Sequence, residues 1–101
     1  MAALEKVADA EVLAQVKSVL GVSGTFHDAA LNVLIADIKY YLEDAGCSND
    51  AVNGKAAIGC IIRGVADLWN IGSGTVNLSP YFKERAAQLA LSYPKGVAKD
   101  V

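Results

Sequence analysis

"HDAALNVLIADIKYYLEDAG", residues 27–46, is the stretch that decides the fold class of this 101-residue chain. Its apolar residues recur at spacings of three and four, so an α-helix would gather them on one face. These residues are Leu31, Leu34, Ile35, Ile38, Leu42 and Ala45. We therefore expect one long helix that ends before Gly46, with a Thr25–Asp28 pair at its start that resembles a capping box.

The same spacing predicts a helix on either side of this central one. Val12 and Val16 lie about one turn apart within residues 9–20, and Gly21 follows as the expected stop. Residues 55–71 carry a broader apolar stripe and predict another helix. This stripe consists of Ile58, Ile61, Ile62, Val65, Leu68 and Trp69.

The last helix has the clearest start signal in the chain. Ser79 is a favoured N-cap residue and Pro80 suits the first helical position, so a helix should run from there to about Tyr93. Residues 47–54 are polar and are predicted to be a plain connection. No segment alternates between polar and apolar residues. The predicted fold class is therefore all-α, a small antiparallel bundle of about four helices with a short flexible C-terminal tail.

Glycines in the second half of the chain predict two further features. Gly59 and Gly64 lie inside the expected third helix, where each costs about 1 kcal/mol relative to alanine, so a neighbouring helix should approach closely there. Gly72, Ser73 and Gly74 invite comparison with a phosphate-binding loop, but no lysine follows them as that motif requires. We interpret these three residues as a hinge that sets the direction of the last helix.

The length and composition fit one domain with one core. We expect residues 1–93 to form a single helical domain and residues 94–101, which have no periodicity, to form a flexible tail. The N-terminus lacks a basic segment followed by an apolar one, and no apolar run is long enough to span a bilayer. The chain is thus expected to start in a cytosol, without a membrane partner.

The net charge of −2 conceals an uneven distribution. Residues 1–50 carry three basic and eight acidic residues, whereas residues 51–101 carry six basic and three acidic residues. One interpretation is chance scatter over solvated faces. The other is a subunit with an acidic and a basic side, which packs head-to-tail with its own copies and closes into a ring. Candidate inter-subunit residues are Tyr40, Glu43, Asp44, Arg63, Lys83 and Arg85.

Two adjacent tyrosines support the idea of a contact surface. Tyr40 and Tyr41 follow each other on the expected long helix, so both cannot face one core. One of them should point away from it and mark a contact surface. The alternative is a half-buried ring that covers the edge of the bundle.

The sequence predicts no catalytic, cofactor-binding or metal-binding residues. Cys60 lies beside an apolar stripe and is best interpreted as a small buried hydrophobe, and the absence of a CxxC motif disfavours structural zinc. His27 lies at the start of a helix, where a cationic imidazole is disfavoured, and is expected to be a surface or packing residue. No carboxylate lies within an apolar stripe where its pKa could be raised for acid–base chemistry.

The order of the segments resembles a known family. "VLAQVKSVLGV" (residues 12–22) leads to the long helix quoted first, then to "AAIGCIIRGVADLWNIGSG" (56–74) and finally to "LSPYFKERAAQLALSY" (78–93). This pattern is similar to the head–tail connector proteins of long-tailed phages, also called adaptor or head-completion proteins. In that family a tryptophan or tyrosine ends the third helix and a glycine-rich loop leads to a short last helix. The matching residues here are Trp69, Gly72, Gly74, Pro80, Tyr81 and Phe82.

The resemblance implies a structural protein. Connectors of this kind form a ring, usually dodecameric, beneath the phage portal protein, extend the channel for genomic DNA without sequence-specific binding, and provide a platform for a stopper or tail-completion protein. It places the chain in the virion, at the neck between head and tail, after synthesis in the cytoplasm of a bacterial host. Because the chain ends soon after Tyr93, a long C-terminal arm is expected to be absent or reduced. The portal-contacting tail would comprise Ser92, Tyr93, Pro94, Lys95, Val97, Lys99 and Val101.

Two alternatives stay open at this point. The first is a small helical regulator that binds DNA, although acidic residues on the expected second helix, such as Asp37 and Asp44, would repel phosphate. The second is a helical interaction module of another kind.

Overall fold

The computed structural model describes residues 4–69 and 78–95, and within them it confirms the all-α prediction. Two isolated bridges are the extended pairings of this part of the chain, Lys6 with Gly54 and Cys47 with Pro94. The helical elements are α1 (Asp9–Leu20), α2 (Asp28–Asp44), α3 (Asn49–Val52), the 3-10 turn η2 (Lys55–Ala57), α4 (Ile58–Trp69) and α5 (Pro80–Ser92).

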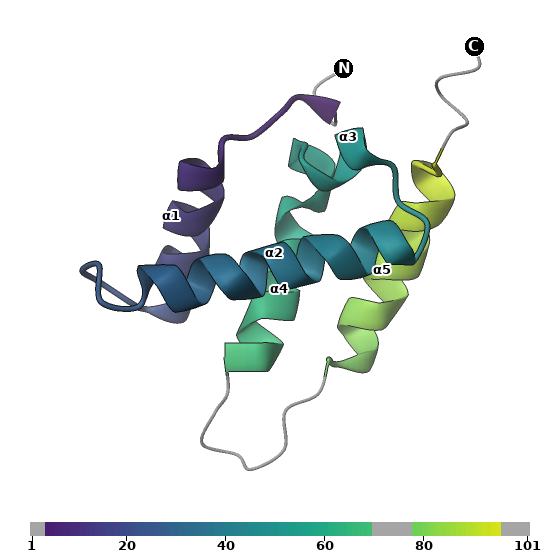
Figure 1. The fold of residues 1–101 in the computed structure, drawn as a ribbon. Coiled ribbons are helices and arrows are strands. Elements are labelled where there is room, and N and C mark those ends of the chain that lie inside the picture. Colours follow the sequence, from purple (N-terminus) through teal and green to yellow (C-terminus); the bar gives the residue numbers. More distant parts are fainter. Residues whose placement is uncertain (1–3, 70–77, 96–101) are drawn as a thin grey trace.

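The long helices surround α4. Figure 1 shows α2 crossing in front of α4, with α1 on one side and α5 on the other. Helices α4 and α5 run in opposite directions, as expected for an antiparallel pair, whereas α2 lies across them. The four long predicted helices are thus present, and α2 covers the layer formed by the others.

The predicted helix ends of α1 and α5 are confirmed. Gly21 ends α1 with a φ of 72°, in the left-handed region that favours glycine. At the start of α5 the Ser79 Oγ accepts a hydrogen bond from the Phe82 backbone N–H at 3.1 Å, and Pro80 occupies the first turn. These ends depend on single residues and their neighbours, which explains why the sequence predicts them well.

The start of α2 differs from the predicted capping box. His27 occupies the N-cap position and no side chain caps the helix. The Asp28 carboxylate instead forms an ion pair with the Lys17 ammonium group at 2.7 Å. The Asp28 backbone N–H donates a hydrogen bond to the Thr25 backbone carbonyl at 3.1 Å. The capping-box prediction was wrong because a lysine from α1 binds the carboxylate, which joins the ends of α1 and α2.

The connection predicted for residues 47–54 is more ordered than a plain loop. It contains the one-turn helix α3, which begins at Ser48, whose Oγ accepts a hydrogen bond from the Ala51 N–H at 3.2 Å. Cys47, Ala51 and Val52 are fully buried. A four-residue helix is too short to show periodicity, so the pattern alone could not predict it.

Gly64 of α4 is buried where α2 and α5 pack against this helix. A Cβ atom at this position would lie 2.7 Å from Ile38 Cδ1 of α2 and 2.7 Å from Phe82 Cε1 of α5. The predicted close approach of neighbouring helices is therefore confirmed for Gly64. It was wrong for Gly59, which is exposed, and a Cβ atom there would have no neighbouring atom within 4 Å.

The predicted apolar stripes face the core, except that Ala45, predicted as the last member of the α2 stripe, lies just after the helix and is exposed. Their buried members include residues from all four long helices, and Phe82 is the largest fully buried side chain. The core residues of the long helices are Val12, Val16, Leu31, Ile35, Ile38, Leu42, Cys60, Ile61, Val65, Phe82, Ala86 and Leu89.

Candidate interaction surface

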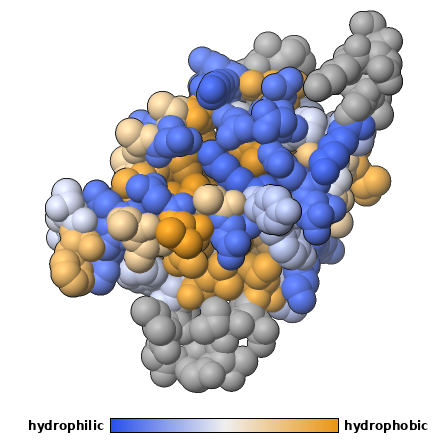
Figure 2. Space-filling view, viewed as in Figure 1, coloured by the Kyte–Doolittle hydropathy of each residue, from blue (hydrophilic) through white to orange (hydrophobic). Residues whose placement is uncertain are grey.

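One surface of α2 presents an aromatic ring to solvent. Tyr40 is 72 % exposed, while the ring of neighbouring Tyr41 lies 5.3 Å from that of Phe82 and is only 37 % exposed. This confirms that one of the two tyrosines points away from the core. Asp37 and Asp44, three residues before and four residues after Tyr40, are also exposed and lie on its side of the helix. Figure 2 shows hydrophilic surface interspersed with smaller hydrophobic areas along α2.

Four ion pairs neutralise charges within the described residues. They are Lys17–Asp28, Lys39–Asp9, Lys55–Glu5 and Arg63–Asp67. Two of them, Lys17–Asp28 and Lys39–Asp9, join α1 to α2. These pairs leave a smaller set of charges for contacts with other molecules.

The remaining charges are grouped unevenly among the helices. Among the described residues, the basic ones that form no ion pair are Lys6, Lys83, Arg85 and Lys95. The acidic ones are Glu11, Asp37, Glu43, Asp44, Asp50 and Glu84. Most of these bases lie on α5 or directly after it, and most of these acids lie on the C-terminal half of α2 or on α3. The unpaired acids are thus concentrated on α2 and α3 and the unpaired bases on and after α5, with Glu84 of α5 as an exception.

The predicted inter-subunit residues fall into two groups. Tyr40, Asp44, Lys83 and Arg85 are exposed, and the last two lie on α5. Glu43 and Arg63 are engaged within the subunit. Glu43 accepts a hydrogen bond from the Asn49 amide at 2.9 Å, and the Arg63 guanidinium lies 3.5 Å from Asp67 and 6.0 Å from the centre of the Tyr81 ring.

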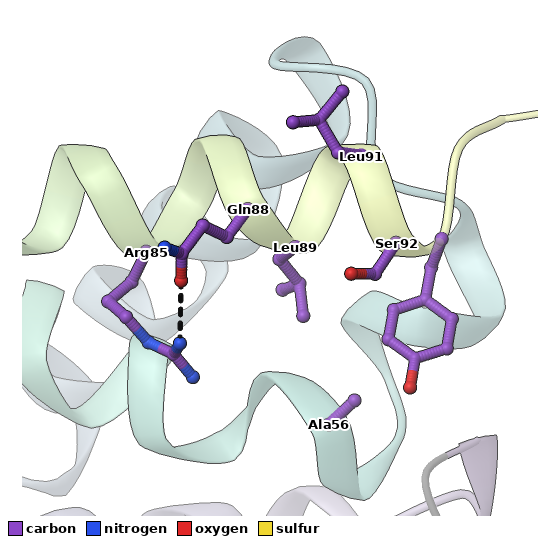
Figure 3. Close-up of a pocket in the computed structure, with 7 residues that line it drawn as sticks. Ala56, Arg85, Gln88, Leu89, Leu91 and Ser92 are labelled. Carbon is purple, nitrogen blue, oxygen red and sulfur yellow. Dashed lines mark hydrogen bonds between the residues drawn. The ribbon is translucent and has the colours of Figure 1, made fainter.

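A groove of about 440 Å³ runs beside α5. Figure 3 shows Arg85, Leu89 and Ser92 on the side of α5 that faces Ala56 of η2, while Leu91 extends away from them. Arg85 donates a hydrogen bond to the Gln88 side-chain oxygen at 2.8 Å. The groove therefore combines apolar walls with a guanidinium whose described partner is a neutral amide. Its lining residues are Ala56, Arg85, Gln88, Leu89, Leu91, Ser92 and Tyr93.

A second groove, of about 530 Å³, is lined by Lys6, Val7, Ala8, Glu11, Gln15, Lys55 and Ile58. Its polar side chains are largely matched within the molecule. Gln15 donates a hydrogen bond to Glu11 at 2.9 Å, and Lys55 lies 3.0 Å from Glu5. This groove thus has fewer charged groups available to a partner than the groove beside α5.

The described part of the predicted tail is bound to the connection after α2. The Tyr93 carbonyl accepts a hydrogen bond from the Ser48 N–H at 2.8 Å, and the Lys95 N–H donates to the Gly46 carbonyl at 3.0 Å. Pro94, between them, pairs with Cys47. Sequence reasoning missed this docking because backbone hydrogen bonds leave no side-chain pattern. Ser92 is exposed, and Val97, Lys99 and Val101 lie outside the described residues.

The predicted hinge, Gly72, Ser73 and Gly74, also lies outside the described residues. The residues at both ends of this connection are described. The Asp67 carboxylate accepts a hydrogen bond from the Ser79 backbone N–H at 2.9 Å. One carboxylate therefore joins the end of α4 to the start of α5.

The two cysteines and the histidine occupy packing positions. Burial raises the pKa of the Cys60 thiol to about 11, with Cys47 adding to the effect and Arg85 opposing it. Burial also raises the pKa of Cys47, against the opposing charge of Lys95. Both thiols are thus protonated at neutral pH and act as small core side chains. The His27 ring contacts Phe26 and Trp69 edge-on, with centroid distances of 4.9 and 5.2 Å.

Metal-binding clusters and membrane-spanning helices are absent from the described part of the chain. No group of three or more histidine, cysteine, aspartate or glutamate residues within it is arranged to hold a metal ion. None of the described helices combines the length and the hydropathy needed to cross a membrane.

Compared with known proteins, the chain matches no protein-family model and shows no significant similarity to a curated protein or to a solved structure.

Proposed function

We propose that the chain is a structural head–tail connector (adaptor) subunit of a tailed bacteriophage. Copies of it form a ring under the portal protein, extend the channel through which genomic DNA passes and dock the stopper or tail-completion protein. The subunit is made in the bacterial cytoplasm and resides at the neck of the virion. The subunit functions through contacts with other proteins and needs neither catalysis nor a cofactor.

One observation carries this proposal furthest: within the described part of the subunit, acidic and basic residues that form no ion pair lie mostly on different helices. Asp37 and Asp44 lie on α2, whereas Lys83 and Arg85 lie on α5. Opposite charges on different surfaces of one chain favour head-to-tail contact between copies and disfavour like-with-like contact. The similarity of the segment order to phage connectors supplies the biological setting.

The acidic character of the whole chain, with a net charge of −2, supports a role beside moving DNA. A ring that bound phosphate strongly would retain DNA through counterion release, whereas a mildly acidic one lets it slide. The same reasoning separates the connector from a DNA-binding regulator.

Co-sedimentation with purified portal particles of the same phage tests the proposal. We expect the full chain to pellet with the portal and to show weak, sequence-independent affinity for duplex DNA at low salt. A chain that stays monomeric and in the supernatant with portal would contradict the proposal. Tight duplex binding that falls steeply with salt would support the regulator instead.

A further inference from the structure

We propose, on the basis of the self-assembly proposed above, that Tyr40 of one copy inserts into the groove beside α5 of the next copy. In this contact Asp37 or Asp44 meets the Arg85 guanidinium of the receiving copy. The occupant of the groove is thus a second copy of this chain, held by an aromatic ring flanked by carboxylates.

The donor side is a compact motif on the outer face of α2. Asp37, Tyr40 and Asp44 are spaced by three and four residues, so they lie on one side of the helix within about 10 Å along its axis. Tyr40 is 72 % exposed, and among the described residues neither aspartate has an ion-pair partner. A large ring with an apolar body and a polar tip is the kind of residue that anchors protein interfaces.

The receiving side has matching chemistry. Leu89 and Ala56 supply apolar surface in the groove (Figure 3), and Tyr93 adds an aromatic ring to its lining. Arg85 is exposed and hydrogen-bonded to Gln88, so an incoming carboxylate would replace a neutral partner with a charged one. Such a charge-assisted, bidentate pair is stronger than the bond to an amide.

The spacing of the contact residues along α2 matches the spacing along α5. Arg85 and Leu89 lie four residues apart on α5, about 6 Å along the helix, and each aspartate lies about 5–6 Å along α2 from Tyr40. The aromatic ring of Tyr40 can therefore contact Leu89 while the carboxylate of Asp37 or Asp44 reaches Arg85. Which aspartate does so depends on the direction in which the two helices cross.

The contact is heterologous, because donor and receiver are different surfaces of the same chain. Each copy has one of each, so the contact repeats and generates a ring or an open filament. Glu43 and Arg63, which are engaged within the subunit, are not needed for it.

Sedimentation of the full chain, alone and on portal particles, tests the charged pair. We expect Arg85→Glu to weaken self-association at least about tenfold, and Tyr40→Ser to do the same, as is typical of central interface residues. Lys6→Glu is the matched control, since it makes the same charge change at an exposed residue that does not line the groove beside α5, and it should weaken association less than about threefold. Helical circular dichroism confirms that each variant is folded.

Exchanging the two charges of the proposed pair distinguishes a direct contact from a general effect of net charge on association. If the pair exists, Asp37→Arg or Asp44→Arg combined with Arg85→Glu restores association, and the variant that succeeds identifies the aspartate. Mixed Tyr40→Cys and Gln88→Cys proteins should form a disulfide-linked heterodimer, whereas Ser18→Cys with Gln88→Cys should not.

The outcomes distinguish the two proposals. Normal association of wild type together with unchanged association of Arg85→Glu and Tyr40→Ser would overturn this contact and leave the connector function in place. Failure of the wild-type chain to associate with itself or with portal would overturn both.

Discussion

The Asp67 carboxylate of α4 accepts a hydrogen bond from the Ser79 backbone N–H at 2.9 Å, across a separation of twelve residues. The same carboxylate lies 3.5 Å from Arg63, one turn earlier on α4. Ser79 is also the N-cap of α5. Asp67 and Ser79 therefore join the end of α4 to the start of α5 across the connection that contains the predicted hinge.

Asp67→Ala should destabilise the subunit by about 1–3 kcal/mol, because it leaves the partly buried Ser79 N–H without its acceptor. Asp67→Asn keeps an acceptor oxygen and loses only the partly exposed ion pair with Arg63, so it should cost less than about 1 kcal/mol. Urea unfolding followed by circular dichroism measures both. Equal losses for the two variants would show that the bond to Ser79 contributes little.

The two glycines of the third predicted helix should respond to alanine in opposite ways. At Gly64 a methyl group would lie 2.7 Å from atoms of Ile38 and Phe82, so Gly64→Ala should destabilise the fold by about 1–3 kcal/mol. At Gly59 nothing lies within 4 Å, so Gly59→Ala should stabilise the helix by up to about 1 kcal/mol. Thermal unfolding of both variants and of the wild-type chain measures these two changes in stability. A stable Gly64→Ala protein would contradict the close packing of α2 and α5 on α4.

This pair of glycines shows what sequence can and cannot predict. The apolar stripes, Gly21, Ser79 and Pro80 are local signals, and the helices they predicted are confirmed. Which of two helical glycines lies under a neighbouring helix is a property of the packed structure. The sequence predicted a close approach, and the fold assigned it to Gly64 alone.

The candidate surface was predicted less completely. Adjacent tyrosines indicated that one would be exposed, and Tyr40 is. The groove beside α5 joins residues far apart in the sequence, Ala56 and Tyr93 among them, so no local pattern indicates it. The hydrogen bond from Lys95 to Gly46 joins backbone groups alone, so no side-chain pattern in the sequence indicates it either.

Burial of Cys60 predicts a pH dependence of stability. The pKa of its thiol is about 11 in the folded chain against 9.0 for an unperturbed thiol, so the folded state binds the proton more tightly. The contribution of this thiol is fully present below pH 9 and is lost as the pH rises from 9 to 11. Urea unfolding across this pH range should show a fall in stability that is smaller in Cys60→Ala. Identical pH profiles would contradict the assignment.

The hinge interpretation of Gly72 and Gly74 stays a prediction. Replacing both with alanine should hinder assembly with portal more than it lowers the helical signal of the monomer. Circular dichroism and co-sedimentation on the same sample compare the two effects. Loss of helix with intact assembly would count against a hinge.

Copies of this chain are proposed to assemble as a ring on the portal. Negative-stain imaging of the purified full chain mixed with portal particles tests it most directly. We predict an added ring of density beneath the portal, which Lys6→Glu retains and Arg85→Glu diminishes. Portal particles that look the same with and without the chain, together with a chain that is strictly monomeric in solution, would contradict it.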